Sequence, residues 1–500
     1  MTGSNVRLRL APSPTGFLHV ATLRLALYNY LFVQQHGGQF ILRIEDTDQA
    51  RTVEGAIEAI YAALEWAGIP LDESPKIGGP YAPYMQSERT PRHQEVARRL
   101  VTEGTAYRCF CTKERLTELR ESQEKRGLPP QYDRKCRHMT ETEVAEELQK
   151  GTPHTIRIKM PLEGEIIGED LLRGKIVFPA KDQDDAILLK TDGFATYHLA
   201  AMVDDADMKI THVVRGEEWI PSYPKHIEII KACGFPMPKF VHTTLILNED
   251  RTKLSKRKGP VAVSNFIEAG YLREALINFL MMVGWTGPET NKELYTMDEL
   301  LKVFSFDRLT TAPAVFKYEK LDWFNGNYIR SKSPEALEAD LVEYLTYMKN
   351  IVVTEDAFTI PSIHQTIPRA TFRKMVTHAQ QKMVKMSEFV PSLDVYFSLA
   401  EYNTSLFFNE KMKVDAAMAK TAMAFLLPIL EEIQEWSIDS LKETIMAKIA
   451  EAGYKNGQIL WPMRVALSGL PMSPGAFEMA DVLGKEETMQ RLQTGLEKLS

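Results

Sequence analysis

The sequence predicts an α/β fold built on a parallel sheet, with an α+β insertion within the sheet and an all-α C-terminal region. Three observations lead to this prediction. A strand–loop–helix–strand pattern fills about the first 45 residues, parallel-strand patterns return only after about residue 210, and strand patterns fade after about residue 335. The chain therefore interrupts one sheet and ends in helices.

The N-terminal segment has the pattern of a β–loop–α–β unit. Val6–Leu10 alternates in polarity and ends before Pro12, as a short strand does. A helix is expected over Ala21–Gln35, then a strand at Gln39–Ile44 and a helix at Val53–Ala67. This order is the beginning of a doubly wound, Rossmann-like sheet.

Residues 83–200 break this pattern. They contain helical stretches and β-like runs at Thr155–Met160, Lys175–Phe178 and Ala186–Leu189. Parallel-strand patterns resume at His212–Arg215 and Phe240–Thr244. An insertion into one sheet explains this order better than two tandem domains.

The last 165 residues or so have helical periodicity. Helices are expected at Pro334–Lys349, Ile367–Met386, Lys413–Ile433 and Ile438–Ala452. We expect this all-helical region to contain two subdomains that divide near residue 400.

Bulk composition excludes several classes of protein. The 500 residues are 44% hydrophobic and 25% charged, with a net charge of −7, as in a globular protein of several structural units. No apolar run approaches the ~20 residues that span a membrane, and the N-terminus lacks the apolar core of a signal peptide, so we expect a cytoplasmic protein without a membrane partner. Four cysteines do not make a disulfide framework. A basic face would suffice for nucleic-acid binding, which the net charge does not exclude.

Two separated segments have the character of nucleotide-binding loops. RLRLAPSPTGFLHVATLRLALYNYLF, residues 7–32, places His19 just before a helix, where an imidazole and backbone N–H groups can bind phosphates. RTKLSKRKG, residues 251–259, places Lys253 and Lys256 in a basic loop that ends in glycine. Each segment alone would more often be a turn with a helix cap, or a solvated loop. In this order they predict an ATP site assembled from both ends of one catalytic domain.

Several strings resemble glutamyl-tRNA synthetase, and more broadly the glutamyl/glutaminyl branch of class I aminoacyl-tRNA synthetases. They are RLAPSPTGFLH, RIEDTD at 43–48, the string YHLAAMVDDADMKITHVVRGEEWIPSYPKH at 197–226, and KLSKRKG at 253–259. FLHVAT occupies the place of the family's HIGH signature. The resemblance covers about the first 330 residues closely and the helical region more weakly, through QILWPMRVALSG and DVLGKEE.

The resemblance implies two sets of site residues. The glutamate-binding positions are Arg9, Ala11, Ser13, Glu45, Tyr197 and Arg215. The ATP-binding positions are Thr15, His19, Glu218, Trp219, Ile246 and Lys256, and His19, Lys253 and Lys256 are the catalytic residues on the phosphates. The charges suit the substrate, because glutamate carries two carboxylates for arginines and one ammonium for Glu45.

The implied reaction uses ATP with Mg²⁺ and has two steps, glutamyl-adenylate formation and transfer to tRNA(Glu). By resemblance, adenylation needs bound tRNA, and the helical region reads the anticodon. That region distinguishes the chain from glutaminyl-tRNA synthetases, whose corresponding part is built of β-barrels. It also distinguishes it from truncated tRNA-modifying relatives. With no coiled-coil pattern, we expect a monomer.

Two residues depart from the family pattern. The family usually has glycine where Ala21 stands and asparagine where Ala201 stands. A methyl group at 21 would crowd the adenosine, and position 201 lacks a polar contact to glutamate. We expect weakened binding of glutamate or ATP, with the chemistry retained.

A C-x-C and a C-x-H motif lie 24 residues apart. Cys109, Cys111, Cys136 and His138 offer three thiolates and one imidazole, a set typical of structural zinc, and zinc-carrying bacterial glutamyl-tRNA synthetases have a similar arrangement. The alternative is a set of reduced cysteines left from a lost site. Cys233 stands apart and is expected to be a buried thiol.

These patterns together predict five segments. They are residues 1–82, the first half of the catalytic domain; 83–200, an inserted acceptor-stem-binding domain with the zinc site; 201–246, the second half of the catalytic domain; 247–335, a connecting domain with the KLSKR loop; and 336–500, the anticodon-binding region.

Three alternatives stay open at this point. One is another class I nucleotidyltransferase, which the KLSKR loop and the helical region disfavour. Another is a catalytically weakened tRNA-binding paralogue, with Ala21 and Ala201 as signs of decay. The third is a nondiscriminating enzyme that also glutamylates tRNA(Gln), because the anticodon-contacting residues cannot be placed from the pattern.

Overall fold

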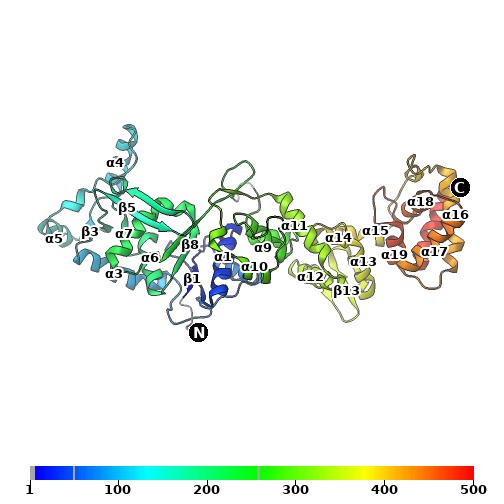
Figure 1. Ribbon diagram of the computed structural model, residues 1–500, viewed down its shortest axis with the longest axis horizontal. Helices are drawn as coiled ribbons and strands as arrows, with labels where there is room; N and C mark the ends of the chain where they lie inside the picture. The colour runs from blue at the N-terminus through cyan, green and yellow to red at the C-terminus, as the bar shows by residue number, and fades with distance from the viewer. Residues whose placement is uncertain (1–5, 49–50, 256–258, 500) are drawn as a thin grey trace. The chain divides into compact units, whose positions relative to one another are not determined.

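The computed structural model describes residues 6–48, 51–255 and 259–499. The chain forms two compact units (Figure 1). Unit 1 contains Met1–Phe266 and Arg273–Lys320, and unit 2 contains Ile267–Leu272 and Leu321–Ser500. The predicted segment 247–335 therefore has residues in both units, and the five sequence-based boundaries remain predictions.

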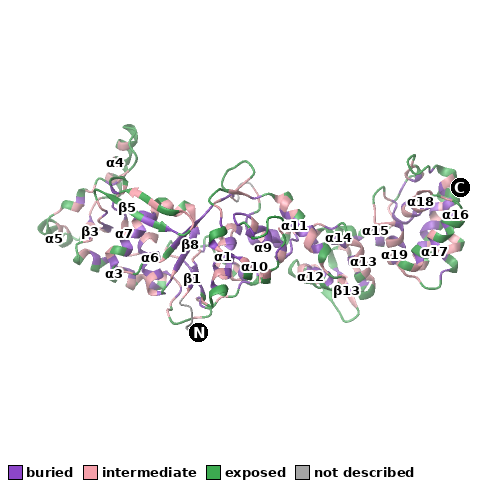
Figure 2. Cartoon of the chain, in the orientation of Figure 1, coloured by how far each residue is buried: buried purple, intermediate pink, exposed green. Residues whose placement is uncertain are grey.

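Unit 1 is built on a six-stranded sheet in the order β2-β1-β8-β9-β5-β6. Its strands are β1 (Arg7–Leu10), β2 (Gln39–Leu42), β8 (His212–Gly216), β9 (Lys239–Thr243), β5 (Glu165–Asp170) and β6 (Gly174–Pro179). All neighbours pair in parallel except β5 and β6, which form an antiparallel hairpin. Every residue of β1 is buried, as expected for a parallel strand covered on both faces (Figure 2).

Helices cover this sheet. They include α1 (Val20–His36), α2 (Ala56–Trp66), α6 (Tyr197–Asp207) and α7 (Tyr223–Cys233). Helix α1 begins after His19, whose side chain caps it, and ends at Gly37, where φ is 59°. Since the left-handed region favours glycine, Gly37 explains where this helix stops. Helices α1 and α2 lie where the sequence predicted them, whereas α6 and α7 were not among the predicted helices.

The segment between α2 and α6 contains a second, antiparallel sheet. It consists of β3 (Ala106–Cys109), β4 (Thr155–Ile158) and β7 (Ile187–Leu189), with helices α3 (Thr90–Thr102), α4 (Lys113–Lys125) and α5 (Glu141–Gln149). The β5–β6 hairpin lies in the same stretch of sequence, yet it extends the main sheet through pairing of Asp170 with Phe240. The insertion is therefore interleaved with the catalytic sheet rather than separate from it.

The rest of unit 1 follows β9. It comprises β10 (Ile246–Leu247) paired in parallel with β11 (Ala314–Val315), helices α9 (Arg273–Met282) and α10 (Met297–Val303), and the first four residues of α8 (Val263–Glu268), whose last two belong to unit 2. Helices α9 and α10 pack against α1. The N-terminal helix is thus enclosed by residues more than 200 positions later in the chain.

Unit 2 is mainly helical. Helix α11 (Tyr318–Ser331) leads into it, and the others are α12 (Pro334–Tyr347), α13 (Arg369–Gln380), α14 (Phe389–Ser392), α15 (Asp394–Phe397), α16 (Ala416–Glu432), α17 (Ile438–Glu451), α18 (Asn456–Ser468) and α19 (Ala476–Lys498). The four long predicted helices are present.

The prediction of an all-helical C-terminal region is wrong at residues 352–368. Three antiparallel strands form there, β12 (Val352–Val353), β13 (Ala357–Ile360) and β14 (Gln365–Pro368). Phe358, Ile360 and Ile367 are buried on one face of this sheet, and the Phe358 ring lies 4.5 Å from that of Phe372 in α13. The predicted helix over Ile367–Met386 included Ile367, which in fact belongs to β14.

No helix among the described residues has the length and apolarity needed to cross a membrane.

Candidate active site

The site lies at the carboxyl edge of the main sheet, where the neighbouring strands β1, β8 and β9 end. Arg9 is near the end of β1, and Arg215 is near the end of β8. Because parallel strands present their carboxyl ends at one edge, side chains from segments far apart in sequence converge there.

His19 stands at the N-terminus of α1. Its Nδ1 accepts a hydrogen bond from the backbone N–H of Ala21 at 3.0 Å, so the ring proton of the neutral imidazole is on Nε2. The positive end of the helix dipole adds to this donor. A phosphate oxygen is the ligand that this arrangement suits.

The two nucleotide-type loops of the sequence lie side by side. The N–H of Val20 donates to the carbonyl of Val261 at 2.9 Å, and the N–H of Val263 donates to the carbonyl of Leu18 at 2.9 Å. His19 thereby pairs with Ala262, just beyond Gly259. The prediction that both loops serve one site agrees with this pairing. Lys256, a predicted ATP-binding and catalytic residue, lies outside the described residues.

Lys253 lies at the start of the second loop. The N–H of Leu254 donates to the carbonyl of Ile246 at 3.0 Å, which attaches this loop to β10. The Lys253 ammonium is 3.7 Å from the Glu218 carboxylate, and both side chains are exposed. The predicted residues Glu218, Ile246 and Lys253 are thus neighbours.

Two carboxylates hold the arginines next to the end of β1. Asp205 Oδ1 accepts from Arg9 Nε at 2.9 Å and from Arg43 Nη1 at 2.6 Å, and Arg43 Nη2 donates to Glu45 at 3.0 Å. All four side chains are buried. Burial raises the pKa of Asp205, but the charges of Arg9 and Arg43 outweigh it and hold the pKa below 3.8.

Glu45 has the opposite balance. Burial raises the pKa of its carboxyl group, and the nearby Arg43 and Arg9 only partly offset this. A cationic ligand group beside Glu45 would stabilise its charged form, as the ammonium of an amino acid does.

Arg215 is held without a carboxylate. Its Nε donates to Nε2 of His242 at 2.9 Å, and its Nη1 bonds to Nδ1 of His226 at 2.8 Å. The ring of Tyr197, at the start of α6, packs on Trp219 with centroids 4.2 Å apart. Arg215 and Tyr197 interact electrostatically, so the predicted glutamate-binding residues of β8 and α6 are adjacent.

Comparisons with known proteins agree with this geometry. Residues 5–323 match the family described as tRNA synthetases class I (E and Q), catalytic domain, and residues 337–496 match an anticodon binding domain. A glutamate–tRNA ligase of Clostridium tetani is 42% identical over 500 residues, which cover 100% of this chain and 99% of that protein. One of Clostridium acetobutylicum is 39% identical, with full coverage of both chains. This chain belongs to the class I glutamyl-tRNA synthetases.

Solved structures of glutamyl-tRNA synthetases have the same fold. The glutamate tRNA ligase of Elizabethkingia meningosepticum, solved in complex with its amino acid, matches with a TM-score of 0.87 and 35% identity, covering 99% of this chain and 100% of that one. The enzyme of Elizabethkingia anophelis matches with a TM-score of 0.85 and 36% identity, with the same coverage.

The remaining residues assigned by family resemblance lie around the same edge. Ala11, Ser13 and Thr15 are in the loop between β1 and α1, where Ser13 and Thr15 are exposed. Sequence reasoning missed Arg43 and Asp205, which lie inside the quoted strings RIEDTD and VDDAD. The acidic residues of VDDAD could have indicated a charged cluster, but the arginines that pair with Asp205 come from distant segments of the chain.

The two departures from the synthetase pattern are close to the site. Ala201 lies in α6 one turn after Tyr197 and one turn before Asp205, and it is fully buried. Because residues four apart share a helix face, Ala201 faces the same side as both. The backbone N–H of Ala21 donates to Nδ1 of His19, and the methyl side chain of Ala21 does not disturb this bond.

The cysteine cluster lies in the insertion of this synthetase. The sulfur atoms of Cys109, Cys111 and Cys136 are all within 4.8 Å of one another. His138, the fourth predicted ligand, is exposed and is not among the residues whose ligand atoms come together in this cluster, so its role stays a prediction. Cys136 and His138 lie in a short 3-10 helix, Lys135–His138, in which residues two apart point in different directions.

Tyr132 contacts the cluster instead. Its hydroxyl donates to, or accepts from, two of the sulfurs, 3.3 Å from Cys109 Sγ and 3.5 Å from Cys111 Sγ. The guanidinium of Arg157 stacks 3.9 Å from the centroid of the Tyr132 ring. Tyr132, which contacts the cysteines, and Tyr197, a predicted glutamate-binding residue, line one cavity of about 420 Å³ together with Arg157 and His198.

Proposed function

We propose that this chain ligates L-glutamate to the 3′ end of tRNA(Glu) with ATP, releasing AMP and pyrophosphate. The observation that carries the proposal is the convergence of three features at one sheet edge. These are the buried arginines Arg9 and Arg215, the buried carboxylate of Glu45, and His19 at the helix N-terminus beside the second loop. Arg9 and Arg215 together suit the two carboxylates of glutamate, and the carboxylate of Glu45 suits its ammonium group.

The first step joins glutamate to AMP. An oxygen of the glutamate α-carboxylate attacks the α-phosphorus of ATP, the bond to the bridging oxygen breaks, and pyrophosphate leaves. His19 Nε2–H and the N-terminus of α1 stabilise the developing negative charge, and Lys253, with Lys256, accompanies the leaving pyrophosphate. Mg²⁺ bound with ATP supplies further charge neutralisation.

In the second step, the terminal ribose hydroxyl of tRNA attacks the glutamyl carbonyl, and AMP leaves. The main contribution of the enzyme to this step is to position the hydroxyl and the adenylate, because the mixed anhydride of glutamyl-adenylate is already reactive. The cavity beside Tyr197 is lined by Arg120, Arg157 and Lys225, and Lys225 forms an ion pair at 3.1 Å with Asp184, which also lines it. The two arginines leave the lining net positive, which suits the phosphates of an RNA end. The helical unit 2 would read the anticodon.

Parallel charging assays test this function. In separate reactions with tRNA(Glu) and tRNA(Gln), purified enzyme with ATP and Mg²⁺ is expected to glutamylate tRNA(Glu). Failure to charge either tRNA, in folded protein, would overturn the proposal in favour of a weakened tRNA-binding paralogue. Charging of tRNA(Gln) as well would identify a nondiscriminating enzyme whose product needs a downstream amidotransferase.

We further infer a structural zinc ion at the cysteine cluster. The Sγ atoms of Cys111 and Cys136 are 3.5 Å apart, close to the ~3.8 Å that tetrahedral coordination with Zn–S bonds of ~2.3 Å requires. The pKa of Cys109 is lowered to about 4, chiefly by the hydrogen bond from Cys136. A thiolate there is the form that binds a metal. When bound, zinc would crosslink β3 to the segment that holds Cys136.

The fourth zinc ligand can be decided by mutation. From the geometry, Tyr132→Phe is expected to lower zinc affinity about 10- to 100-fold, while His138→Ala leaves it near wild type. Zinc content after dialysis against graded chelator, measured by elemental analysis, gives the comparison. The reverse order would restore His138 as the ligand, and wild-type protein without zinc would contradict the metal site.

A further inference from the structure

The guanidinium of Arg215 is fixed by two histidines. Arginine only donates hydrogen bonds, so the nitrogens that face it, Nε2 of His242 and Nδ1 of His226, must both be unprotonated acceptors. Both imidazoles are therefore neutral in this arrangement. Each must carry its single proton on the nitrogen that faces away from Arg215.

The partners on the far side of each ring match this requirement. Nδ1 of His242 lies 2.7 Å from Oδ2 of Asp170, which can only accept. Nε2 of His226 lies 3.0 Å from Nδ1 of His198. The result is one row of hydrogen bonds, Asp170–His242–Arg215–His226–His198, in which the direction of every bond is determined by the arginine.

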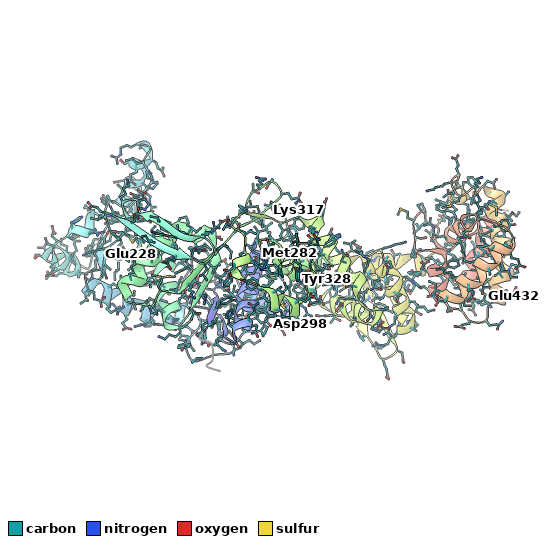
Figure 3. The ribbon with its side chains drawn as sticks, in the orientation of Figure 1. Glu228, Met282, Asp298, Lys317, Tyr328 and Glu432 are labelled. Carbon is teal, nitrogen blue, oxygen red and sulfur yellow. The ribbon has the colours of Figure 1, made fainter. Side chains whose placement is uncertain are left out.

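The row is buried. Its members come from β5, β9, β8, α7 and α6, and His226 and His242 are both fully buried. Burial is the main cause that lowers the pKa of each of these two histidines, and the charge of Arg215 lowers it further. The outer side of α7 differs, since Glu228, labelled in Figure 3, forms an ordinary surface pair with Lys231 at 2.8 Å.

The charge of Arg215 is left for a ligand. Arg9 and Arg43 each form an ion pair with a carboxylate, but no ion pair of Arg215 is found among the residues that the structure describes. Its Nη2 is buried and, within the same described part of the chain, has no hydrogen-bond partner of ordinary geometry, although Tyr197 is close enough to interact with the guanidinium. Two neutral acceptors thus orient the guanidinium of Arg215 without neutralising its charge. A buried donor without an acceptor costs stability, and a ligand that accepts from it removes that cost.

We propose that His226 and His242 are positioning residues, which hold Arg215 through neutral acceptors so that its charge and its Nη2 donor bind a carboxylate of glutamate. This inference rests on the proposed function and names how that function selects its acidic substrate. Replacing a histidine by a carboxylate would hold Arg215 equally well but would compete with the substrate for it.

A crossover of asparagine and glutamine tests the geometry. Asparagine places its amide near the Nδ1 position of histidine, and glutamine places it near the Nε2 position. His226→Asn and His242→Gln therefore keep an acceptor for Arg215, whereas His226→Gln and His242→Asn do not. The better residue at one position is the worse residue at the other.

The expected result is a specific rise in the KM of glutamate. His226→Gln and His242→Asn raise it about 10- to 100-fold, the range for a lost hydrogen bond to a charged group, and leave the KM of ATP within about 2-fold. His226→Asn and His242→Gln stay within about 5-fold of wild type for glutamate. Four variants with equal KM values for glutamate, or no rise in the two misplaced ones, would overturn the proposal.

Asp170→Asn provides a second test where a histidine variant fails to fold. It keeps the shape of the side chain but leaves one acceptor oxygen where two now serve, one for Nδ1 and the backbone N–H of His242 and the other for the N–H groups of Leu172 and Arg173, so one of these two sets of donors loses its acceptor. It is expected to raise the KM of glutamate, again without changing that of ATP. An unchanged KM of glutamate in folded Asp170→Asn would contradict the row as a positioning device.

Failure of the proposed function would be seen separately. Wild-type enzyme that charges neither tRNA overturns the function before any variant is compared. In that case glutamate binding to wild type and to the four histidine variants is measured directly by calorimetry, and the same crossover order is still expected.

Discussion

Replacing His19 with asparagine is expected to lower the rate of glutamyl-adenylate formation by about 10²- to 10³-fold, the usual cost of losing one donor to developing charge. Asparagine can still cap α1 through its side-chain oxygen, as His19 does through Nδ1. It cannot supply the Nε2–H that faces away from the cap. Pyrophosphate exchange, measured with tRNA present, gives the rate.

Two comparisons isolate the cause. His19→Ala is expected to lose a similar factor in rate and, in addition, about 1 kcal/mol of stability from the missing cap. His36→Ala, at the other end of the same helix, is expected to leave the rate unchanged. If His19→Asn kept the wild-type rate, the imidazole would be a helix cap and nothing more.

Removing the carboxylate of Asp205 is expected to destabilise unit 1 by about 3–5 kcal/mol, because Arg9 and Arg43 would remain as buried charges that have lost a partner. Asp204→Ala is expected to cost a similar amount, since Asp204 pairs with Arg89 and His93 and is fully buried. Chemical denaturation followed by tryptophan fluorescence measures both. Only Asp205→Ala is expected to raise the KM of glutamate as well, through Arg9.

The matched control is Asp207→Ala on the same helix. Asp207 is partly exposed and pairs with Arg89 and Arg92, so about 1 kcal/mol or less is expected. Equal costs for all three variants would contradict the account.

Acid has a related effect. Burial raises the pKa of both Asp204 and Asp205. Their basic partners lower it by more, so the pKa of each carboxyl group is lower in the folded than in the unfolded protein. Their stabilising contribution is complete above the unfolded pKa and is lost as the pH falls through the folded pKa.

Local patterns predicted most of the elements that position the site. The β1–α1–β2 unit follows from alternation, helical periodicity and Gly37, which act over a few residues. The two signature loops could be assigned to one site because family resemblance supplied the order of motifs. Their contact through Val20 and Val261 is long-range, and no local pattern encodes it.

The features that the sequence did not reveal are short or tertiary. The strands β12–β14 have two to four residues, too few to establish a period against the surrounding helices. The C-x-H spacing is compatible with a metal ligand, but His138 ends the 3-10 turn Lys135–His138 and its side chain is exposed. The histidine row joins residues 170, 198, 226 and 242, whose proximity only the sheet order establishes.

The enclosure of α1 by later segments has a consequence during synthesis. Leu23, Leu27 and Leu31 of α1 are fully buried, and α1 packs on β1, α9 and α10. When α1 leaves the ribosome, roughly 250 residues through α9 are still to be made, which takes about 10–50 s at ~5–20 residues per second. The leucine-rich face of α1 has no native partner from α9 or α10 during that interval, so it stays exposed to solvent or to chaperones until those helices are made.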